Sequence, residues 1–135
     1  MMRVRGIRGA TTVKHNTEQE IISATRTLLE KLIEENDIAE DDVASVLFTT
    51  TPELTAAFPA KAAREMGWSQ VALMGAAEIA AMNGIPMCIR VLIHWNTEKG
   101  LDEIVHVYMR GAEVLRKDLY PDHRVYVKNG EDESK

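Results

Sequence analysis

The spacing of apolar and polar positions predicts one long helix near the N-terminus. Apolar residues recur at three- and four-residue intervals from Ile21 to Ile33, and charged residues fill the opposite side. Thr17 followed three residues later by Glu20 has the spacing of a capping box, in which two side chains satisfy free N–H groups at a helix start. The pattern predicts a helix that begins at Thr17 and ends near Asn36.

Short runs rich in β-branched and aliphatic residues predict strands over 2–10, 43–50, 70–74, 87–95 and 105–110. A short helix is predicted over 58–67, where Pro59 suits the first helical position and Gly67 the position beyond the end. This order of elements indicates an α+β fold, with a mixed sheet of about five strands and one long and one short helix on one face. We expect a single domain over 1–127 and a flexible C-terminal tail over 128–135.

The two central strands, 43–50 and 87–95, carry apolar residues on both of their faces. The chain's own helices can cover only one face of the sheet, so the other face needs a partner or solvent. With a single substantial helix available, the pattern predicts a homo-oligomer.

Composition narrows the class of protein. A net charge of -5 and an aromatic content of 5% in 135 residues disfavour nucleic acid as the partner. The single cysteine excludes an internal disulfide framework and fits a reducing compartment. No apolar stretch has the length of a membrane span, and no signal peptide is recognisable. We therefore expect a cytoplasmic protein with no membrane partner.

Arg90 interrupts the otherwise apolar run 87–95. Because side chains alternate across a strand, it shares a face with Cys88, Leu92 and His94. Burial of a guanidinium is unfavourable unless a negatively charged, hydrogen-bonding group meets it. That group is either a carboxylate of the protein or an anionic ligand, and the strand pattern leaves both open.

Candidate chemistry is limited by what the chain lacks. The serines have no nucleophile-elbow context, the histidines have no metal-ligand spacing, and Cys88 in an apolar strand is typical of a small hydrophobe. The most informative polar residues are arginines, whose planar fork suits carboxylates. We interpret four of them as a site for a small dicarboxylate: Arg8, Arg64, Arg90 and Arg116. Ion pairing with surface acids is the alternative, and we prefer it for Arg26 and Arg110.

Glu78 stands alone in an alanine-rich stretch, where a wholly solvated role is not obvious. It is either a site residue or the N-terminal charge of a short helix that begins near Gly75.

Several separated segments, taken in order, resemble the monofunctional chorismate mutases of the trimeric α+β type. The resemblance extends over residues 2–119 and is carried by segments 5–13, 58–65, 88–91, 106–108 and 114–116. It implies an isomerase that converts chorismate to prephenate for phenylalanine and tyrosine synthesis, with no cofactor and no metal. It also implies a homotrimer that forms a pseudo-α/β barrel, with active sites between subunits.

The resemblance assigns roles to individual positions. Arg90 would contact the ether oxygen and a carboxylate of chorismate, and Glu78 would hold its hydroxyl group. Arg8 and Tyr108 would bind a carboxylate and fix its orientation. Further residues would line the site or its entrance: Phe58, Lys61, Arg64, Leu73, Met74, Gly75, Leu115 and Arg116. Met74 and Gly75 stand where the family often carries a hydroxyl and a thiol, so any contact there would be through the backbone.

Two other classes of function fit the same residues. One is a non-catalytic trimeric binder of anionic metabolites. The other is an enamine or imine hydrolase, which rests on analogy with a related trimeric fold.

Overall fold

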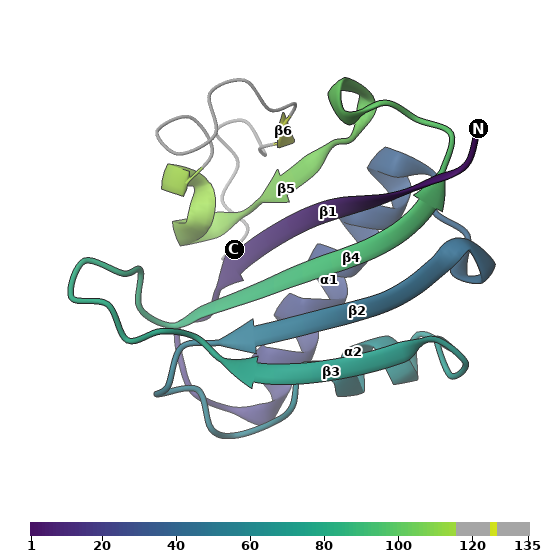
Figure 1. Cartoon of the computed structure of the whole chain (residues 1–135). Coiled ribbons are helices and arrows are strands. Elements are labelled where there is room, and N and C mark those ends of the chain that lie inside the picture. The colour runs from purple at the N-terminus through teal and green to yellow at the C-terminus, as the bar shows by residue number, and fades with distance from the viewer. Residues whose placement is uncertain (116–124, 127–135) are drawn as a thin grey trace.

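One mixed sheet of six strands forms the centre of the protein, in the order β3-β2-β4-β1-β5-β6 (Figure 1). The computed structural model describes residues 1–115 and 125–126. The main elements are β1 (Arg3–Thr12), α1 (Glu18–Asn36), β2 (Val43–Thr50), α2 (Ala60–Glu65), β3 (Ala72–Ala77), β4 (Cys88–Thr97), β5 (His106–Tyr108) and β6 (Val125–Tyr126). Strand β4 is antiparallel to both β1 and β2, whereas β3 is parallel to β2, and β5 is parallel to β1 and β6. Short 3-10 turns lie at Glu40–Asp42, Leu101–Glu103 and Arg110–Val114.

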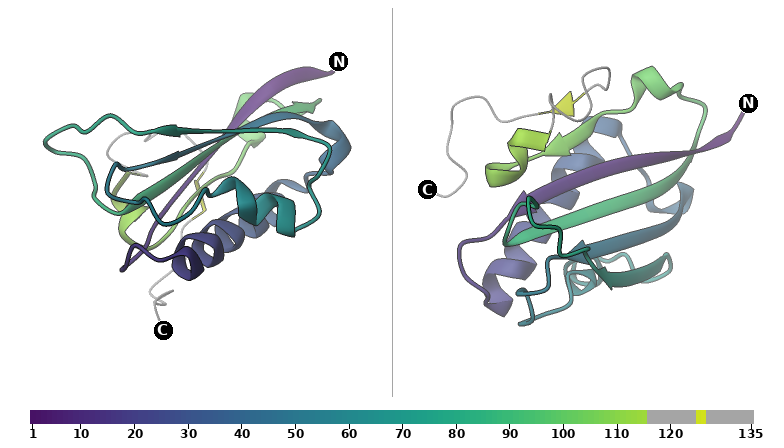
Figure 2. Two further views of the ribbon diagram at one scale, coloured as in Figure 1. Left: turned by 90° about the horizontal axis from the view of Figure 1, so that it is seen from below. Right: turned by 60° about the vertical axis from the view of Figure 1, so that its left-hand side comes forward.

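Both α-helices lie on the same face of the sheet, as expected (left panel of Figure 2). The hydrophobic core fills the space between the helices and the sheet. Every second residue of a strand belongs to this core; in β4 these are Val91, Ile93 and Trp95. Helix α1 comes especially close to β1 at Gly9, where a Cβ atom would lie 2.8 Å from Leu32 Cδ1. Burial of this one face positions α1 and the two long central strands against each other.

Residues that point away from the helices form what we call the open face of the sheet. It carries apolar and charged side chains together: Val4, Arg8, Leu47, Thr49, Met74, Arg90, Leu92 and His94. Met74 is 69% exposed, while Leu47 and Leu92 are half-buried. The central strands therefore carry apolar residues on both faces, but on the open face polar and charged side chains lie between them.

Helix α1 begins where the sequence predicts, but its capping differs. The Thr17 hydroxyl accepts the N–H of Glu20 at 3.2 Å. The Glu20 carboxylate does not return to Thr17; it accepts the N–H groups of Lys14 and His15 and meets the His15 ring. These contacts, above all the one to the His15 side chain, lower the pKa of Glu20. The predicted capping box is thus half right, and Glu20 instead orders the turn that leads from β1 into the helix.

Several boundaries differ from the prediction for backbone reasons. Met87, at φ 55, and Arg110, at φ 53, have left-handed conformations that a strand cannot contain, so β4 begins at Cys88 and β5 ends before Arg110. Helix α2 starts at Ala60. Pro59 is therefore its N-cap and not, as expected, its first helical residue. Gly67 has φ 98, which fits its expected place after the helix.

The third strand is the largest difference. The sequence predicts it over 70–74, whereas β3 runs from Ala72 to Ala77 beside β2. Alanine and glycine are poor strand formers, but the parallel ladder with β2 overrides that preference. The short helix considered for Gly75 onward is therefore wrong. The sixth strand, β6, was not expected, and the predicted tail 128–135 lies outside the described residues.

Asn36, the last residue of α1, joins this helix to the segment that leads into β5. Its amide nitrogen donates to the carbonyls of Leu32 (3.0 Å) and Val105 (2.9 Å), and its amide oxygen accepts the N–H of Val105 at 2.8 Å. The side chain is fully buried. This single amide therefore fixes where β5 enters the sheet.

We predict that Asn36→Ala lowers the free energy of unfolding by about 3 kcal/mol, because it leaves buried groups of Val105 without partners. Asn16 is a matched control, since its exposed amide also makes three hydrogen bonds, all to Thr55 and Ala56. Water can replace those bonds, so Asn16→Ala should cost about 1 kcal/mol or less. Urea unfolding at one protein concentration measures both, and equal losses would contradict the role given to Asn36.

Candidate active site

A cavity of about 210 Å³ lies on the open face of the sheet, and we call it the open-face cavity. Its lining comes from β1, β2, β4, β5 and the residue that follows β3: Arg8, Gly9, Ala10, Leu47, Thr49, Glu78, Arg90, Val91, Leu92 and Tyr108. Its charged side chains are two arginines, Arg8 and Arg90, and one acid, Glu78. The lining carries an excess of positive charge, which suits an anionic ligand.

Arg90 and Glu78 form the centre of this cavity. Arg90 Nε lies 3.6 Å from Glu78 Oε2, and the side chains are 35% and 26% exposed. That distance is short enough for an ion pair but longer than a hydrogen bond. Arg90 Nε has no hydrogen-bond partner among the described residues. Both sequence interpretations of Arg90 are thus partly met: an acid of the same chain lies beside it, and the guanidinium still borders an open cavity.

Two further expected residues approach the cavity from neighbouring strands. Strand β5 pairs with β1 through only two residue pairs, one of which joins Ala10 to Tyr108. The buried His106 ring strengthens this short connection, because its Nδ1 accepts the backbone N–H of Arg8 at 3.0 Å. A ring nitrogen that accepts a hydrogen bond carries no proton, so the remaining proton of a neutral imidazole lies on Nε2. His106 thus ties together the strands that carry Arg8 and Tyr108.

One wall beside the cavity is apolar. Ala10, Cys88, Tyr108, Ala112 and Leu115 form a buried cluster. Leu115 lies directly after the 3-10 turn Arg110–Val114, so the turn brings it back toward the sheet. Arg116, also expected at the site, lies outside the described residues.

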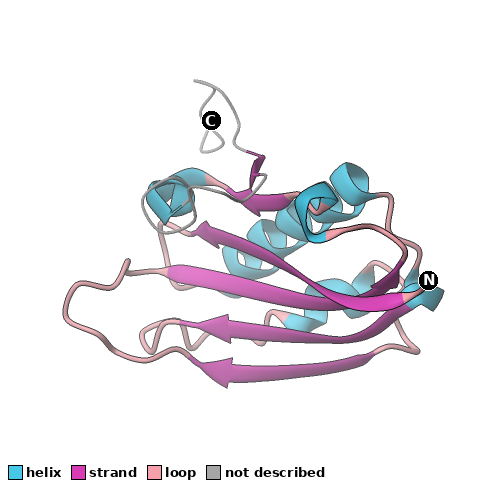
Figure 3. Cartoon of the chain, turned by 45° about the horizontal axis from the view of Figure 1, so that its top comes forward, coloured by secondary structure: helices cyan, strands magenta, loops and turns pink. Residues whose placement is uncertain are grey.

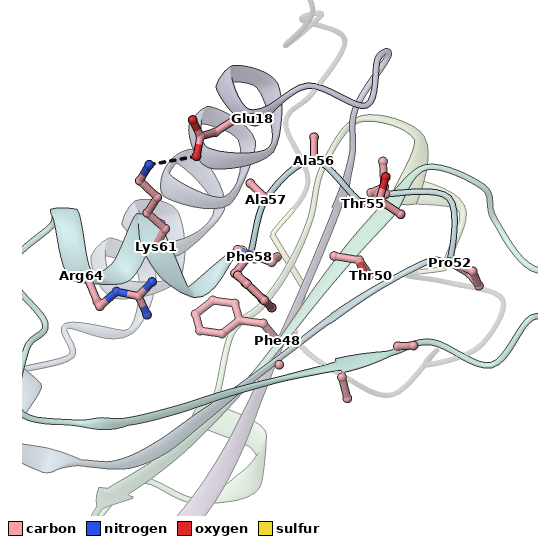
Figure 4. A pocket seen from close by; sticks show the side chains of 15 residues that line it. Glu18, Phe48, Thr50, Pro52, Thr55, Ala56, Ala57, Phe58, Lys61 and Arg64 are labelled. Atoms are coloured by element: carbon pink, nitrogen blue, oxygen red, sulfur yellow. Dashed lines mark hydrogen bonds and ion pairs between the residues drawn. The ribbon is translucent and has the colours of Figure 1, made fainter.

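A second cavity, of about 590 Å³, lies on the helix side of the sheet, and we call it the helix-side cavity. Figure 4 shows Phe58, Lys61 and Arg64 around it, with Phe48 at its floor. Phe58 is 77% exposed, although it is a large aromatic residue. Lys61 Nζ donates to Glu18 Oε2 at 2.9 Å, and this hydrogen bond raises the pKa of Lys61.

The two cavities share no lining residue, and alternation along β2 places them on opposite faces of that strand. On β2, Leu47 and Thr49 line the open-face cavity, whereas Phe48 and Thr50 line the helix-side cavity. Gly75 also lines the helix-side cavity. Within one copy, the two sets of lining residues therefore belong to separate cavities.

The expected site residues consequently fall into groups. Arg8, Glu78, Arg90 and Tyr108 line the open-face cavity, whereas Phe58, Lys61, Arg64 and Gly75 line the helix-side cavity. Leu73 packs against the main core, and Met74 lines neither cavity.

Comparisons with known proteins bear directly on this arrangement. The family model described as "Chorismate mutase type I" matches residues 4–119. Chorismate mutase AroH of Bacillus subtilis (strain 168) is 48% identical over 119 residues, covering 87% of this chain and 94% of the relative. Chorismate mutase AroH of Thermus thermophilus is 49% identical over 117 residues, covering 86% and 96%. A solved chorismate mutase from Clostridium thermocellum superposes with a TM-score of 0.81 at 50% identity, covering 82% of this chain and 99% of that one.

The chain belongs to the chorismate mutase type I family. The family resemblance seen in the sequence is therefore confirmed, and so is the α+β fold.

Several residues of this chorismate mutase chain border the open-face cavity without having been expected there. Thr49 is the most informative, because its hydroxyl donates to Glu78 Oε2 at 2.6 Å. Leu47 and Leu92 add apolar surface from β2 and β4. Strand alternation alone could have placed Leu92 on the same face as Arg90. Nothing in the sequence, however, gives the strand register that places Thr49 opposite Arg90.

The described residues contain no group of three or more His, Cys, Asp or Glu side chains placed to hold a metal ion. No helix in the described part of the chain has the length and hydropathy of a membrane span. Cys88 is buried, as expected for a small hydrophobe, and its burial raises the pKa of the thiol despite the nearby Arg90. This thiol is therefore protonated at neutral pH and poorly suited to act as a nucleophile.

We predict that the Cys88 thiol reacts with Ellman's reagent at least about 100-fold more slowly in the native protein than in urea, because burial hinders access and disfavours the thiolate. Absorbance of the released chromophore at pH 7 measures both rates. Rapid, stoichiometric reaction of the native protein would show an accessible thiolate and would contradict the packing described here.

Proposed function

We propose that this protein converts chorismate to prephenate. The observation that carries the proposal is the half-buried Arg90 guanidinium, which borders an open cavity with Glu78 beside it. Membership of the chorismate mutase family and relatives of that name at 48% and 49% identity support it.

The chemistry fits a site without a nucleophile. The rearrangement breaks one carbon–oxygen bond and forms one carbon–carbon bond in a single pericyclic step, with no obligatory proton transfer. The enzyme must fold a flexible dicarboxylate into a reactive shape and stabilise charge that develops in the transition state. Negative charge grows on the ether oxygen, where a fixed guanidinium donor contributes about 3 kcal/mol.

The residues of the open-face cavity divide this work. Arg90 contacts the ether oxygen and a carboxylate, and Glu78 accepts the substrate hydroxyl and faces the part of the ring that loses electrons. Arg8 and Tyr108 bind a carboxylate and set its orientation. Leu115 supplies an apolar wall. The family resemblance also assigns Arg116 to the entrance, but this residue lies outside the part of the chain that the structure describes.

We infer that a complete site needs two copies of the chain. The open-face cavity, at about 210 Å³, is smaller than the roughly 300–1,000 Å³ that is usual for ligand sites. The remaining proposed residues, Phe58, Lys61 and Arg64, border a cavity on the opposite face.

Packing of the open face against a neighbouring copy would bury its apolar residues and bring the helix-side cavity of one copy to the open-face cavity of the next. Three copies in a closed ring, as the family resemblance implies, give three such sites. Gly75 lines the helix-side cavity and would add its backbone groups from the second copy, whereas Leu73 packs against the core and Met74 lies on the open face.

The assay is loss of chorismate absorbance with purified protein and no added cofactor. Turnover to prephenate supports the mutase. Tight binding of chorismate without turnover would indicate the metabolite-binding alternative, and ammonia release from an imino acid would indicate the hydrolase.

We predict that Arg90→Lys lowers kcat by about 100-fold to 1,000-fold, because lysine keeps the charge but loses the planar fork. The fold should survive, as judged by circular dichroism. Arg26→Lys is the matched control, since Arg26 pairs with Glu30 on the exposed side of α1 and should change kcat by less than about twofold. Near-normal turnover of Arg90→Lys would refute the role of Arg90.

We predict that the shared site allows two inactive variants to complement each other. Arg90→Ala removes the open-face half, and the double substitution Lys61→Ala/Arg64→Ala removes the helix-side half. Mixed trimers of the two variants contain some sites in which both halves are intact, so co-expression should restore turnover to about one tenth or more of wild type. Light scattering gives the oligomeric state of each preparation. Mixed trimers without restored activity would place both halves of the site in one chain.

A further inference from the structure

We propose that Thr49 is a positioning residue for this site. Its hydroxyl holds the Glu78 carboxylate at ion-pair distance from Arg90 and keeps that carboxylate from occupying the guanidinium fork. The inference rests on the proposed function, because it concerns how the open-face cavity stays ready for a dicarboxylate.

Thr49 lies between the two charged residues because of sheet register. It is directly opposite Arg90 in the β2–β4 ladder, and both side chains are on the open face. On its other side, Thr49 pairs with Ala76 of β3, two residues before Glu78. The strands thus place a hydroxyl donor within reach of both partners of the ion pair.

The contact distances differ in kind. Thr49 Oγ1 donates to Glu78 Oε2 at 2.6 Å, which is the length of a strong hydrogen bond to a charged acceptor. Arg90 Nε lies 3.6 Å from the same oxygen, beyond hydrogen-bond distance. Glu78 is therefore held by the hydroxyl rather than by the guanidinium, although arginine and a carboxylate normally prefer a paired, bidentate contact.

The backbone of Glu78 is fixed, so its side chain alone decides this balance. Its N–H donates to the carbonyl of Thr50 at 2.8 Å, directly after the end of β3. If the hydroxyl were absent, rotation of the Glu78 side chain would bring its carboxylate onto the Arg90 donors. An incoming carboxylate or ether oxygen would then compete with an internal acid for the same fork, and Glu78 would leave the position from which it meets the substrate hydroxyl.

Thr49→Val replaces the hydroxyl by a methyl group of similar size and keeps a β-branched residue that favours strands. We expect it to lower kcat/KM about 10-fold to 100-fold, the factor associated with one hydrogen bond to a charged group, with KM raised as well as kcat lowered. Calorimetric binding of a bicyclic dicarboxylate transition-state mimic should weaken by a similar factor. Thr49→Ser should restore both quantities to within about threefold of wild type, because it returns the hydroxyl.

Thr25→Val is the matched control. The buried Thr25 hydroxyl makes a bond of similar length, 2.7 Å, to the Ile21 carbonyl within α1, away from both cavities. Thr25→Val should therefore leave kcat and KM within about twofold of wild type.

Two further measurements test whether Thr49 acts through Glu78. In a Glu78→Ala background, Thr49→Val should have almost no additional effect on mimic binding. A crystal structure of Thr49→Val should show a Glu78 oxygen within hydrogen-bond distance of Arg90. An undiminished effect in the Glu78→Ala background, failure of Thr49→Ser to rescue, or an unchanged 3.6 Å separation in the variant would overturn the proposal. Absence of chorismate turnover in the wild type would refute the proposed function instead, and the variant's structure would still decide the role of Thr49.

Discussion

A permanent positive charge in the middle of a central strand is the constraint on which the site depends. Strand β4 is hydrogen-bonded on both sides, to β1 and β2, so its backbone cannot shift to bring Arg90 to the edge of the sheet. Alternation along the strand then requires the side chain to stand on the open face. A cation held this way needs compensation, which here comes partly from Glu78. Compensation is partial, since Arg90 Nε makes no hydrogen bond within the described residues. In the function proposed above, this partly compensated charge favours binding of a dianionic substrate.

Much of the fold could be predicted because its elements carry strong local signals. Helix α1 has both a regular apolar stripe and the Thr17 cap, and β2 was predicted with its observed bounds. Prediction of β3 was poorer, since its residues are alanine, glycine, leucine and methionine, and only the ladder with β2 makes them a strand. The ends of β4 and β5 depend on left-handed residues, Met87 and Arg110, whose conformations no local pattern announces.

Prediction of the candidate site followed the same division. Arg90 was identifiable because a charge in an apolar run is itself a signal, whereas Thr49 is one of two neighbouring threonines at the end of β2. Its importance comes from pairing register between segments that are far apart in the sequence, which hydrophobic spacing does not specify. The separation of the proposed residues onto two faces could not be predicted from the sequence either. The family resemblance names the positions but does not say which copy supplies each of them. A cytoplasmic location and the role of Arg116 stay predictions.

The connection between β3 and β4 has a consequence for how this enzyme can vary. Strand β2 lies between β3 and β4, so the chain must pass beyond the end of the sheet to cross it (Figure 3). Both ends of that crossing are anchored, by the Glu78 N–H on the Thr50 carbonyl and by the Met87 N–H on the Glu53 carboxylate. Between these anchors, insertions and deletions can accumulate without disturbing strand register. Evolution or engineering can therefore reshape the rim of the site, and with it substrate access, while the charged centre keeps its geometry.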